Sequence, residues 1–494
     1  MKVPADGRAL AALAMAVALG SALISGACGQ TRYAVRGNVR PAPVDLDIAS
    51  LPGARGFWFP EPEYGGRIYV LVAGKNAPSR QAPTVVLVHG LGDAGVRDFY
   101  PLLAELGRER RIVTFDLPGF GRSDKANVKY APDRFARVVS EVVTAFAEGP
   151  VDVVGHSMGG AISLLHAATF PAQVRHLVVI DAAGILHREA WVAQHLRRVT
   201  EPTGRVSPRV AEAMADAATM IVDASRLFGA APDVILEVGF LRQKILRAEP
   251  GRIAALSLML HDFGPALAHI EAPTLIVWGA KDVVAPLRTG YLLADRVPNA
   301  RLFVIPEAGH VVMQDAPVPL LVEIKSHLAG PPAGAALAPL PIWPAAGDVA
   351  IAGVAGAGGR EGVCRGTADV AFRGSYDSVV LEDCKDARLE EVRARRLVIK
   401  RSSASVVRST FTEGIVADTS TLLMTGGGVD GAVAIEAKDS QLDLAGVAIA
   451  TKGEACHMTG QTRVVYSVCP VRTARGLAYR HGFESSTATA PVAP

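Results

Sequence analysis

The sequence predicts an α/β fold, with a doubly wound, mostly parallel sheet and a helical cap, joined to a C-terminal all-β domain of the β-helix type. Between residues 66 and 330, continuously apolar runs such as TVVLV and HLVVI alternate with stretches of helical pattern. Strands buried on both faces are typical of a parallel sheet covered by helices. Beyond residue 363, short alternating runs recur every 16 to 20 residues, a period typical of stacked β-coils.

Length, charge and cysteine positions limit the function classes. A chain of 494 residues is long enough for two or three domains. With 51 Lys and Arg against 48 Asp and Glu, the formal net charge is +3, which offers no broad basic field for the phosphates of a nucleic acid. The five cysteines are at positions 28, 364, 384, 456 and 469. The predicted α/β domain therefore contains none.

Residues 1–28 have the pattern of an export signal. Lys2 and Arg8 precede an uncharged Ala- and Leu-rich run, and small residues then lead to Cys28. This ending resembles the lipobox of bacterial lipoproteins, although Ser25 replaces the usual aliphatic residue. The resemblance implies lipidation of Cys28 and an exported protein anchored in the bacterial cell envelope, at the periplasmic side or the cell surface. An ordinary signal peptide and a transmembrane helix, for which the run is short, are the alternatives.

The α/β domain is expected at residues 66–330, after a polar tether at 29–65. Residues 185–265 have helical patterning and no clear strand, which predicts an inserted cap. A Pro-, Ala- and Gly-rich stretch at 331–362 predicts a linker. The predicted strands are residues 67–72, 84–88, 111–115, 151–154, 176–180, 274–277 and 301–305.

The C-terminal domain is predicted as a β-solenoid at residues 363–475, followed by a disordered tail at 476–494. Two interleaved series of alternating runs suggest two strands per coil. Cys364 and Cys384 lie about one coil apart, where stacked Cα atoms are within disulfide reach, and Cys456 with Cys469 would form the second bond. Four cysteines allow three pairings, among which the sequence alone does not choose. An irregular β-sandwich is the alternative fold.

The segment GHSMGG at residues 155–160 is the centre of the predicted chemistry. The strand VDVV runs directly into it and a helical pattern follows, which is the strand–turn–helix context of a G-x-S-x-G nucleophile elbow. The turn would place Ser157 at a helix N-terminus, where backbone N–H groups favour the negative charge that develops in acyl transfer. We therefore predict Ser157 as a nucleophile.

A serine nucleophile needs a base, and the base needs a carboxylate that orients it. Asp282 and His310 each follow the carboxyl end of a predicted strand, where open parallel sheets place their sites. The order Ser, Asp, His, with separations of 125 and 28 residues, is the order that sheets with such an elbow use. In HGLG, after the strand TVVLV, the N–H of Leu91 can face the substrate oxygen. With the N–H of Met158 it would form an oxyanion hole.

Five motifs together resemble the α/β-hydrolase superfamily, in its esterase- and lipase-like branch. The resemblance covers a little over half of the chain and implies Ser157 as nucleophile, His310 as general base and acid, and Asp282 as the orienting carboxylate. It also implies Leu91 and Met158 as the oxyanion donors. The motifs are HGLGD at 89–93, DLPGFGRSD at 116–124, GHSMGG at 155–160, WGAKD at 278–282 and AGH at 308–310.

Two further expectations concern the site. Asp181, which ends the strand HLVVI, is an alternative to Asp282, since some relatives take the acid from the preceding strand. No Cys, His or carboxylate cluster has metal-ligand spacing, and HGLG lacks the glycine fingerprint of a dinucleotide site. We therefore expect neither a metal nor a cofactor.

These observations predict a serine hydrolase that cleaves a carboxylic ester, or a related acyl bond, of a small to medium apolar substrate. A C–C bond hydrolase or a thioesterase is the alternative within the fold, because the same framework hosts all these reactions. A cell-surface glycan-binding or adhesion protein, with the solenoid as its working module, is the alternative from another class. The solenoid strands carry few aromatic residues for sugar stacking, namely Phe372, Tyr376, Phe411 and Tyr466.

Overall fold

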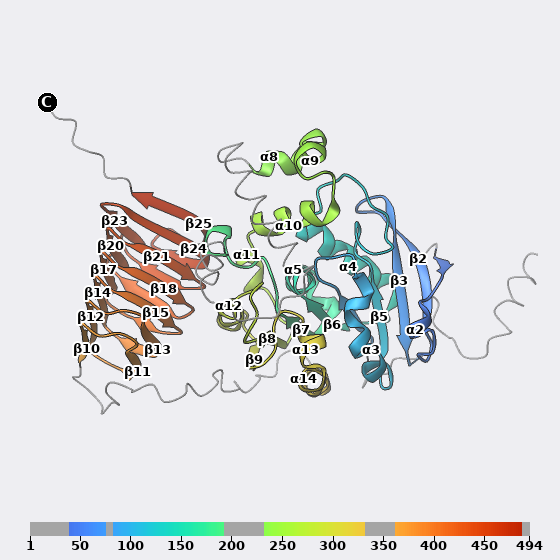
Figure 1. The fold of residues 1–494 in the computed structure, drawn as a ribbon, viewed down its shortest axis with the longest axis horizontal. Coiled ribbons are helices and arrows are strands. Elements are labelled where there is room, and N and C mark those ends of the chain that lie inside the picture. Colours follow the sequence, from blue (N-terminus) through green and yellow to red (C-terminus); the bar gives the residue numbers. More distant parts are fainter. Residues whose placement is uncertain (1–38, 76–82, 192–231, 331–360, 487–494) are drawn as a thin grey trace, which may run out of the picture.

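The computed structural model describes residues 39–75, 83–191, 232–330 and 361–486. They form an α/β domain and a β-solenoid that lie side by side (Figure 1). The predicted fold class, α/β with a C-terminal all-β domain, is confirmed. The predicted export signal, Cys28 and nearly all of the predicted linker lie outside the described residues.

A nine-stranded sheet forms the centre of the α/β domain, in the order β1-β2-β3-β5-β4-β6-β7-β8-β9. Strands β4 to β9 run parallel, and β1, β2 and β3 add an antiparallel edge. All seven strands that the sequence predicts are present. The strands are β1 (Arg40–Ala42), β2 (Arg55–Glu61), β3 (Gly66–Gly74), β4 (Val85–Val88), β5 (Arg111–Phe115), β6 (Val151–His156), β7 (Val174–Ile180), β8 (Thr274–Gly279) and β9 (Ala300–Ile305).

The domain begins earlier than the sequence predicted. Part of the segment expected as a tether, residues 29–65, forms β1, α2 (Leu46–Ala49) and β2, and β2 pairs with β3 along its whole length. The strand is held because Phe57 and Phe59 both contact the ring of Phe146 in the core. The sequence pattern of β2 is a weak signal for a strand, because Pro60 interrupts the apolar run. Pro60 lies beyond the residues that pair with β1, where a missing N–H is tolerated.

Helices cover both faces of the sheet. Alternate residues of one strand point to opposite faces, so Val86 and Val88 belong to one buried cluster and Val85 and Leu87 to another. The described part of the predicted cap contains α8, α9 and α10, and residues 192–231 of that cap lie outside the described residues. Besides α2, the helical elements of the described residues are η1 (Gly95–Phe99), α3 (Tyr100–Gly107), α4 (Pro132–Phe146), α5 (Met158–Thr169), η2 (Pro171–Gln173), α8 (Pro232–Glu237), α9 (Gly239–Ile245), α10 (Pro250–Leu260), α11 (Gly264–Leu267), α12 (Arg288–Arg296), α13 (Val312–Asp315) and α14 (Pro317–Ala329).

None of these helices in the described ranges is long and apolar enough to cross a membrane.

The C-terminal domain is a stack of parallel β-coils, as predicted, but its later coils contain three strands and not two. A six-stranded sheet forms one face, and the strands of the second sheet fall into two series. The short strands β16, β19 and β22 form the third face, and their two to four residues are too few for a periodic signal. The first sheet contains β10 (Glu361–Arg365), β12 (Ser378–Glu382), β14 (Arg396–Lys400), β17 (Ile415–Asp418), β20 (Ile435–Lys438) and β23 (Cys456–Thr459), and the second contains β11 (Ala371–Ser375), β13 (Ala387–Ala394), β15 (Ser403–Val407), β16 (Thr410–Phe411), β18 (Thr421–Thr425), β19 (Gly428–Gly431), β21 (Gln441–Ala445), β22 (Ala448–Thr451), β24 (Thr462–Thr473) and β25 (Gly476–Ser486).

Two details of this domain differ from the prediction. Residues 476–486 are not a disordered tail, because β25 pairs antiparallel with β24. The disulfide between Cys364 and Cys384 is present, with Cα atoms 6.4 Å apart, but Cys456 and Cys469 are free thiols. Cys456 lies on the first sheet and Cys469 on the second, so the second bond does not form.

A ladder of buried hydroxyl groups stabilises one corner of the solenoid. The backbone N–H of Ser402 donates to Oγ of Ser420 at 3.1 Å, and the N–H of Ser420 donates to Oγ of Ser440 at 3.0 Å. Cys384 and Thr462 extend the ladder by one coil at each end. Each side chain therefore satisfies a buried donor of the preceding coil, which would be costly to leave unpaired.

Replacing Ser420 by Ala should lower the free energy of unfolding by about 1–3 kcal/mol, because the buried N–H of Ser402 loses its acceptor. Urea denaturation followed by circular dichroism measures the change. The control is Ser405→Ala, a half-buried serine of β15 outside the ladder. Equal stabilities of the two variants would contradict the role of the ladder.

Candidate active site

The turn between β6 and α5 holds Ser157 in a strained conformation, with φ 54° and ψ −120°. Close packing enforces this turn. A Cβ atom on Gly155 would lie 2.3 Å from the carbonyl oxygen of Gly159, and a Cβ on Gly159 would lie 2.1 Å from that of Val88. Only glycine fits at either position, so the start of α5 lies directly against β4.

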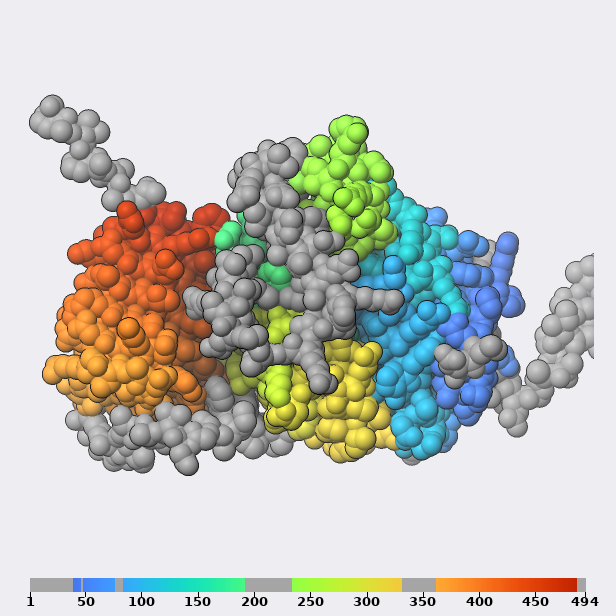
Figure 2. Space-filling view, in the orientation of Figure 1, coloured from blue at the N-terminus to red at the C-terminus, as the bar shows by residue number. Residues whose placement is uncertain are grey.

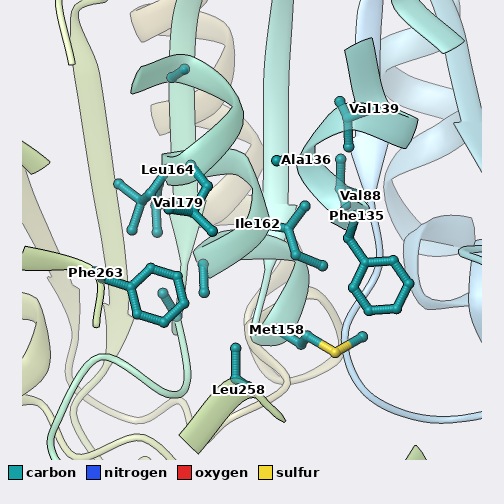
Figure 3. Packing of buried hydrophobic residues seen from close by; sticks show 14 of the residues in the cluster. Val88, Phe135, Ala136, Val139, Met158, Ile162, Leu164, Val179, Leu258 and Phe263 are labelled. Carbon is teal, nitrogen blue, oxygen red and sulfur yellow. The ribbon is translucent and has the colours of Figure 1, made fainter. Parts of the chain in front are cut away.

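Apolar packing around α5 fixes this helix against the sheet (Figure 3). Met158 and Ile162 face Val88 and Phe135 on one side, and Leu164 lies beside Val179 on the other. All of these side chains are buried. The serine backbone is thus set by the core of the domain.

The structure brings the three predicted side chains into one hydrogen-bonded chain. Nε2 of His310 lies 2.9 Å from Oγ of Ser157, and Nδ1 of His310 lies 2.8 Å from Oδ2 of Asp282. With neutral imidazole, Ser157 donates to Nε2 and the Nδ1–H donates to the carboxylate. His310 follows β9 and Asp282 follows β8, so both come from the carboxyl end of the parallel strands.

The acid is held by its own loop. Oδ1 of Asp282 accepts the backbone N–H groups of Val284 and Ala285 at 2.7 and 2.9 Å. These bonds satisfy a fully buried carboxylate and direct its second oxygen toward His310. The arrangement gives the imidazole a fixed orientation and a partner for positive charge.

His156 holds the base from the opposite side. Its Nε2–H donates to the backbone carbonyl of His310 at 2.8 Å. Burial lowers the pKa of His156 to about 3, so the ring is neutral near pH 7. His156 therefore positions the loop that carries His310.

The predicted oxyanion loop lies against the elbow. A Cβ on Gly90 would lie 3.0 Å from Cβ of Ser157. The ring of His89 fixes the loop, because its Nδ1–H donates to the carbonyl of Gly90 at 2.7 Å and its Nε2 accepts the N–H of Leu117 at 2.9 Å. Leu91 is half-buried on this loop and Met158 is buried at the start of α5. Both predicted donors thus belong to segments that flank Ser157.

Comparison with known proteins decides the family of this domain. Residues 83–317 match the family model described as alpha/beta hydrolase fold. This part of the chain belongs to the α/β-hydrolase superfamily. The predicted superfamily is confirmed, and the domain is called the hydrolase domain below.

Relatives of the hydrolase domain catalyse different reactions. The dihydrolipoyllysine-residue acetyltransferase component of an acetoin cleaving system from Pseudomonas putida is 31% identical over 241 residues, 47% of this chain and 60% of that protein. A 2-hydroxy-6-oxo-6-(2'-aminophenyl)hexa-2,4-dienoic acid hydrolase from Metapseudomonas resinovorans is 28% identical over 259 residues, 50% of this chain and 82% of that protein. A solved hydrolase from Pseudomonas aeruginosa PA01 is 22% identical, with a TM-score of 0.42, over 56% of this chain and 98% of that chain.

Asp181 is not the partner of His310, but it lies directly behind Asp282. Its Oδ1 accepts the N–H of Gly279 at 2.8 Å. Burial, and then the negative charge of Asp282, raises the pKa of Asp181 well above its usual value. A hydrogen bond with the side chain of Asp282 also favours the protonated form of Asp181. The sequence placed Asp181 at the carboxyl end of its strand, but it could not show that burial beside Asp282 raises the pKa of Asp181.

Neither a cluster of metal-binding side chains nor a cavity away from the triad offers a second site of chemistry in the described residues. In the described parts of the chain, no group of three or more His, Cys, Asp or Glu side chains could hold a metal ion. A cavity of about 310 Å³ lies where α11 and α12 meet the solenoid, lined by Leu267, Arg296 and Tyr479 among others. None of its lining residues belongs to the triad, so it is not the site of chemistry.

Replacing Asp181 by Asn should make stability less sensitive to a rise of pH above about 4. The unfolded wild type ionises this carboxyl near its usual pKa of 3.8, whereas the folded protein keeps it protonated to higher pH. Wild-type stability therefore falls as pH rises from about 4 toward the raised pKa, by up to about 1.4 kcal/mol per pH unit. The difference in unfolding free energy, Asp181→Asn minus wild type, should grow as pH rises above about 4.5. Urea titrations at a series of pH values from 4.5 upward measure it, and a constant difference would contradict a raised pKa at Asp181.

Proposed function

We propose that this protein is a serine hydrolase that cleaves a carboxylic ester, or a related acyl bond, through an acyl-enzyme. The observation that carries the proposal is the chain Ser157–His310–Asp282, with distances of 2.9 and 2.8 Å at a strained elbow. This arrangement provides a nucleophile, a base within reach of its proton and a carboxylate that orients the base.

The geometry suggests the following reaction. Oγ of Ser157 attacks the acyl carbon while Nε2 of His310 takes its proton, and Asp282 stabilises the resulting imidazolium. The N–H groups of Leu91 and Met158 receive the oxyanion at the positive end of α5. His310 returns the proton to the leaving alcohol. It then activates water, which releases the acid and restores the serine.

Replacing Ser157 by Ala should lower turnover of p-nitrophenyl esters at least about a thousandfold, because the covalent route is lost. The same variant should not be labelled by a fluorophosphonate probe. Ser140→Ala, a half-exposed position on α4, serves as the control and should behave as the wild type. Undiminished labelling of Ser157→Ala would exclude Ser157 as the nucleophile.

C–C bond hydrolysis is the second candidate, because the similar protein from Metapseudomonas resinovorans is named as a dienoic acid hydrolase. If esters are the substrates, a series of p-nitrophenyl esters should show saturable turnover, with acyl-chain preference. A 2-hydroxy-6-oxohexa-2,4-dienoate, followed by loss of its absorbance, should then be hydrolysed at least about a hundredfold less efficiently. The reverse ratio would replace the ester proposal by C–C bond cleavage.

The structure further weakens the glycan-binding alternative. Phe372, Tyr376, Phe411 and Tyr466 are all buried inside the solenoid, so these four rings cannot stack on a sugar. We therefore place the activity of the protein in the hydrolase domain.

The envelope location is part of the same proposal and rests on the sequence alone. Export and lipidation of Cys28 would hold the hydrolase at a membrane surface, near apolar esters. In a bacterial host, Cys28→Ala should move the protein from the membrane fraction to the soluble fraction. Unchanged fractionation would contradict an anchor at Cys28.

A further inference from the structure

The solenoid is packed against the hydrolase domain over a continuous buried surface. Ala445, Val465 and Val468 of the solenoid belong to the same apolar cluster as Leu292 and Leu293 of α12. In Figure 1, α11 and α12 lie between the central sheet and the solenoid, and Figure 2 shows the solenoid, in orange and red, beside the hydrolase domain. The solenoid is therefore docked and not a tethered appendage.

A buried ion pair lies at this interface. Arg288 is the first residue of α12, and Asp443 is on β21 of the solenoid. Nη1 and Nη2 of Arg288 contact Oδ2 and Oδ1 of Asp443 at 2.6 and 3.1 Å, and Nε donates to Oγ1 of Thr425 at 3.2 Å. The side chains are only 8% and 11% exposed. Because a lone buried charge is costly, each side chain requires the other domain.

Arg288 ends the loop that carries the catalytic acid. Asp282 lies at the start of this loop and is bound to the N–H groups of Val284 and Ala285. Trp278 donates its Nε1–H to the carbonyl of Ala285 at 2.8 Å. Asp282 and Ala285 thus fix the loop to the triad and to the sheet. Arg288, which directly follows the loop, fixes it to the solenoid.

The solenoid also contacts both ends of the predicted cap. At the first end, the N–H of His187 donates to Oγ of Ser467 at 2.9 Å, and Glu189 pairs with Arg463 at 2.6 Å. The ring of His481 on β25 lies 5.1 Å from that of His187. The same β24 and β25 pack against α11, which begins at the second end.

We propose that the solenoid is a positioning domain of the hydrolase: docked through Arg288 and Asp443, it holds the loop of Asp282 and both ends of the cap in the geometry that catalysis requires. This inference rests on the proposed function of Ser157. Asp443 and Arg288 are positioning residues, since neither touches the reacting atoms. A displacement of about 1 Å in a triad is enough to lower a rate by as much as a hundredfold.

The full-length chain with Asp443→Asn, on the solenoid, and with Arg288→Met, on the hydrolase side, tests the proposal. Both variants should label Ser157 with a fluorophosphonate about tenfold or more slowly than the wild type. The kcat for a p-nitrophenyl ester should fall by a similar factor while KM changes less than about twofold. Arg288→Lys, which keeps the charge, should recover part of the loss.

Arg301→Met is the matched control. Arg301 has an equally buried side chain, 9% exposed, and pairs with Glu323 at 2.9 Å within the hydrolase domain. It should lose stability as Arg288→Met does but keep the wild-type labelling rate. Rates are measured well below each melting temperature and scaled to folded protein. If Arg288→Met does not fold, Asp443→Asn, which retains an acceptor for Arg288, decides the test.

The outcomes separate this inference from the proposed function. If the wild type is not labelled, the proposed function fails and this inference fails with it. If the wild type is labelled and Asp443→Asn reacts at the same rate, only the positioning role is excluded. An equal loss in Arg301→Met would also exclude it, because the effect would then be general destabilisation.

Discussion

The contact between the start of α5 and strand β4 is the constraint on which the geometry of the proposed catalytic triad depends. No side chain fits at Gly159, because its Cβ would lie 2.1 Å from the carbonyl oxygen of Val88. This close approach accompanies a φ of 54° at Ser157, and the Ser157 hydroxyl lies within hydrogen-bond distance of His310. Strain of this kind costs of order 1–3 kcal/mol and persists only where surrounding packing imposes it. The apolar side chains around α5 supply that packing.

The triad also requires that the buried charge of Asp282 be compensated. Asp282 is fully buried, and two backbone N–H groups together with His310 satisfy it. Asp181 lies behind it as a second buried carboxyl, and burial, then the charge of Asp282, raises the pKa of Asp181 well above its usual value. His156 is neutral near pH 7, because burial lowers its pKa to about 3. Burial thus disfavours charge on two groups that surround the pair of Asp282 and His310.

Much of this site could be predicted because its signals are local. The central strands are apolar on both faces, and Ser157, Asp282 and His310 each follow one of them in a recognisable order. The sequence did not predict strand β2, because Pro60 interrupts its apolar run. The strand becomes evident only from its pairing with β3. The third strand of the later coils and β25 were not predicted, because short or polar strands depend on their neighbours. The pairing of Cys456 with Cys469 was wrong because proximity in sequence does not place two residues on the same face.

The docking of the solenoid could not be predicted, because the ion pair between Arg288 and Asp443 joins residues 155 apart and has no periodic signal. It changes the interpretation of the chain from an enzyme with an appendage to one folded unit.

Mass spectrometry of an acid-quenched reaction tests the central claim most directly. During turnover of a slowly deacylating p-nitrophenyl ester, the peptide containing Ser157 should gain the mass of the acyl group, at up to one equivalent per enzyme. Turnover without an acyl adduct, or with the adduct on another residue, would contradict the account.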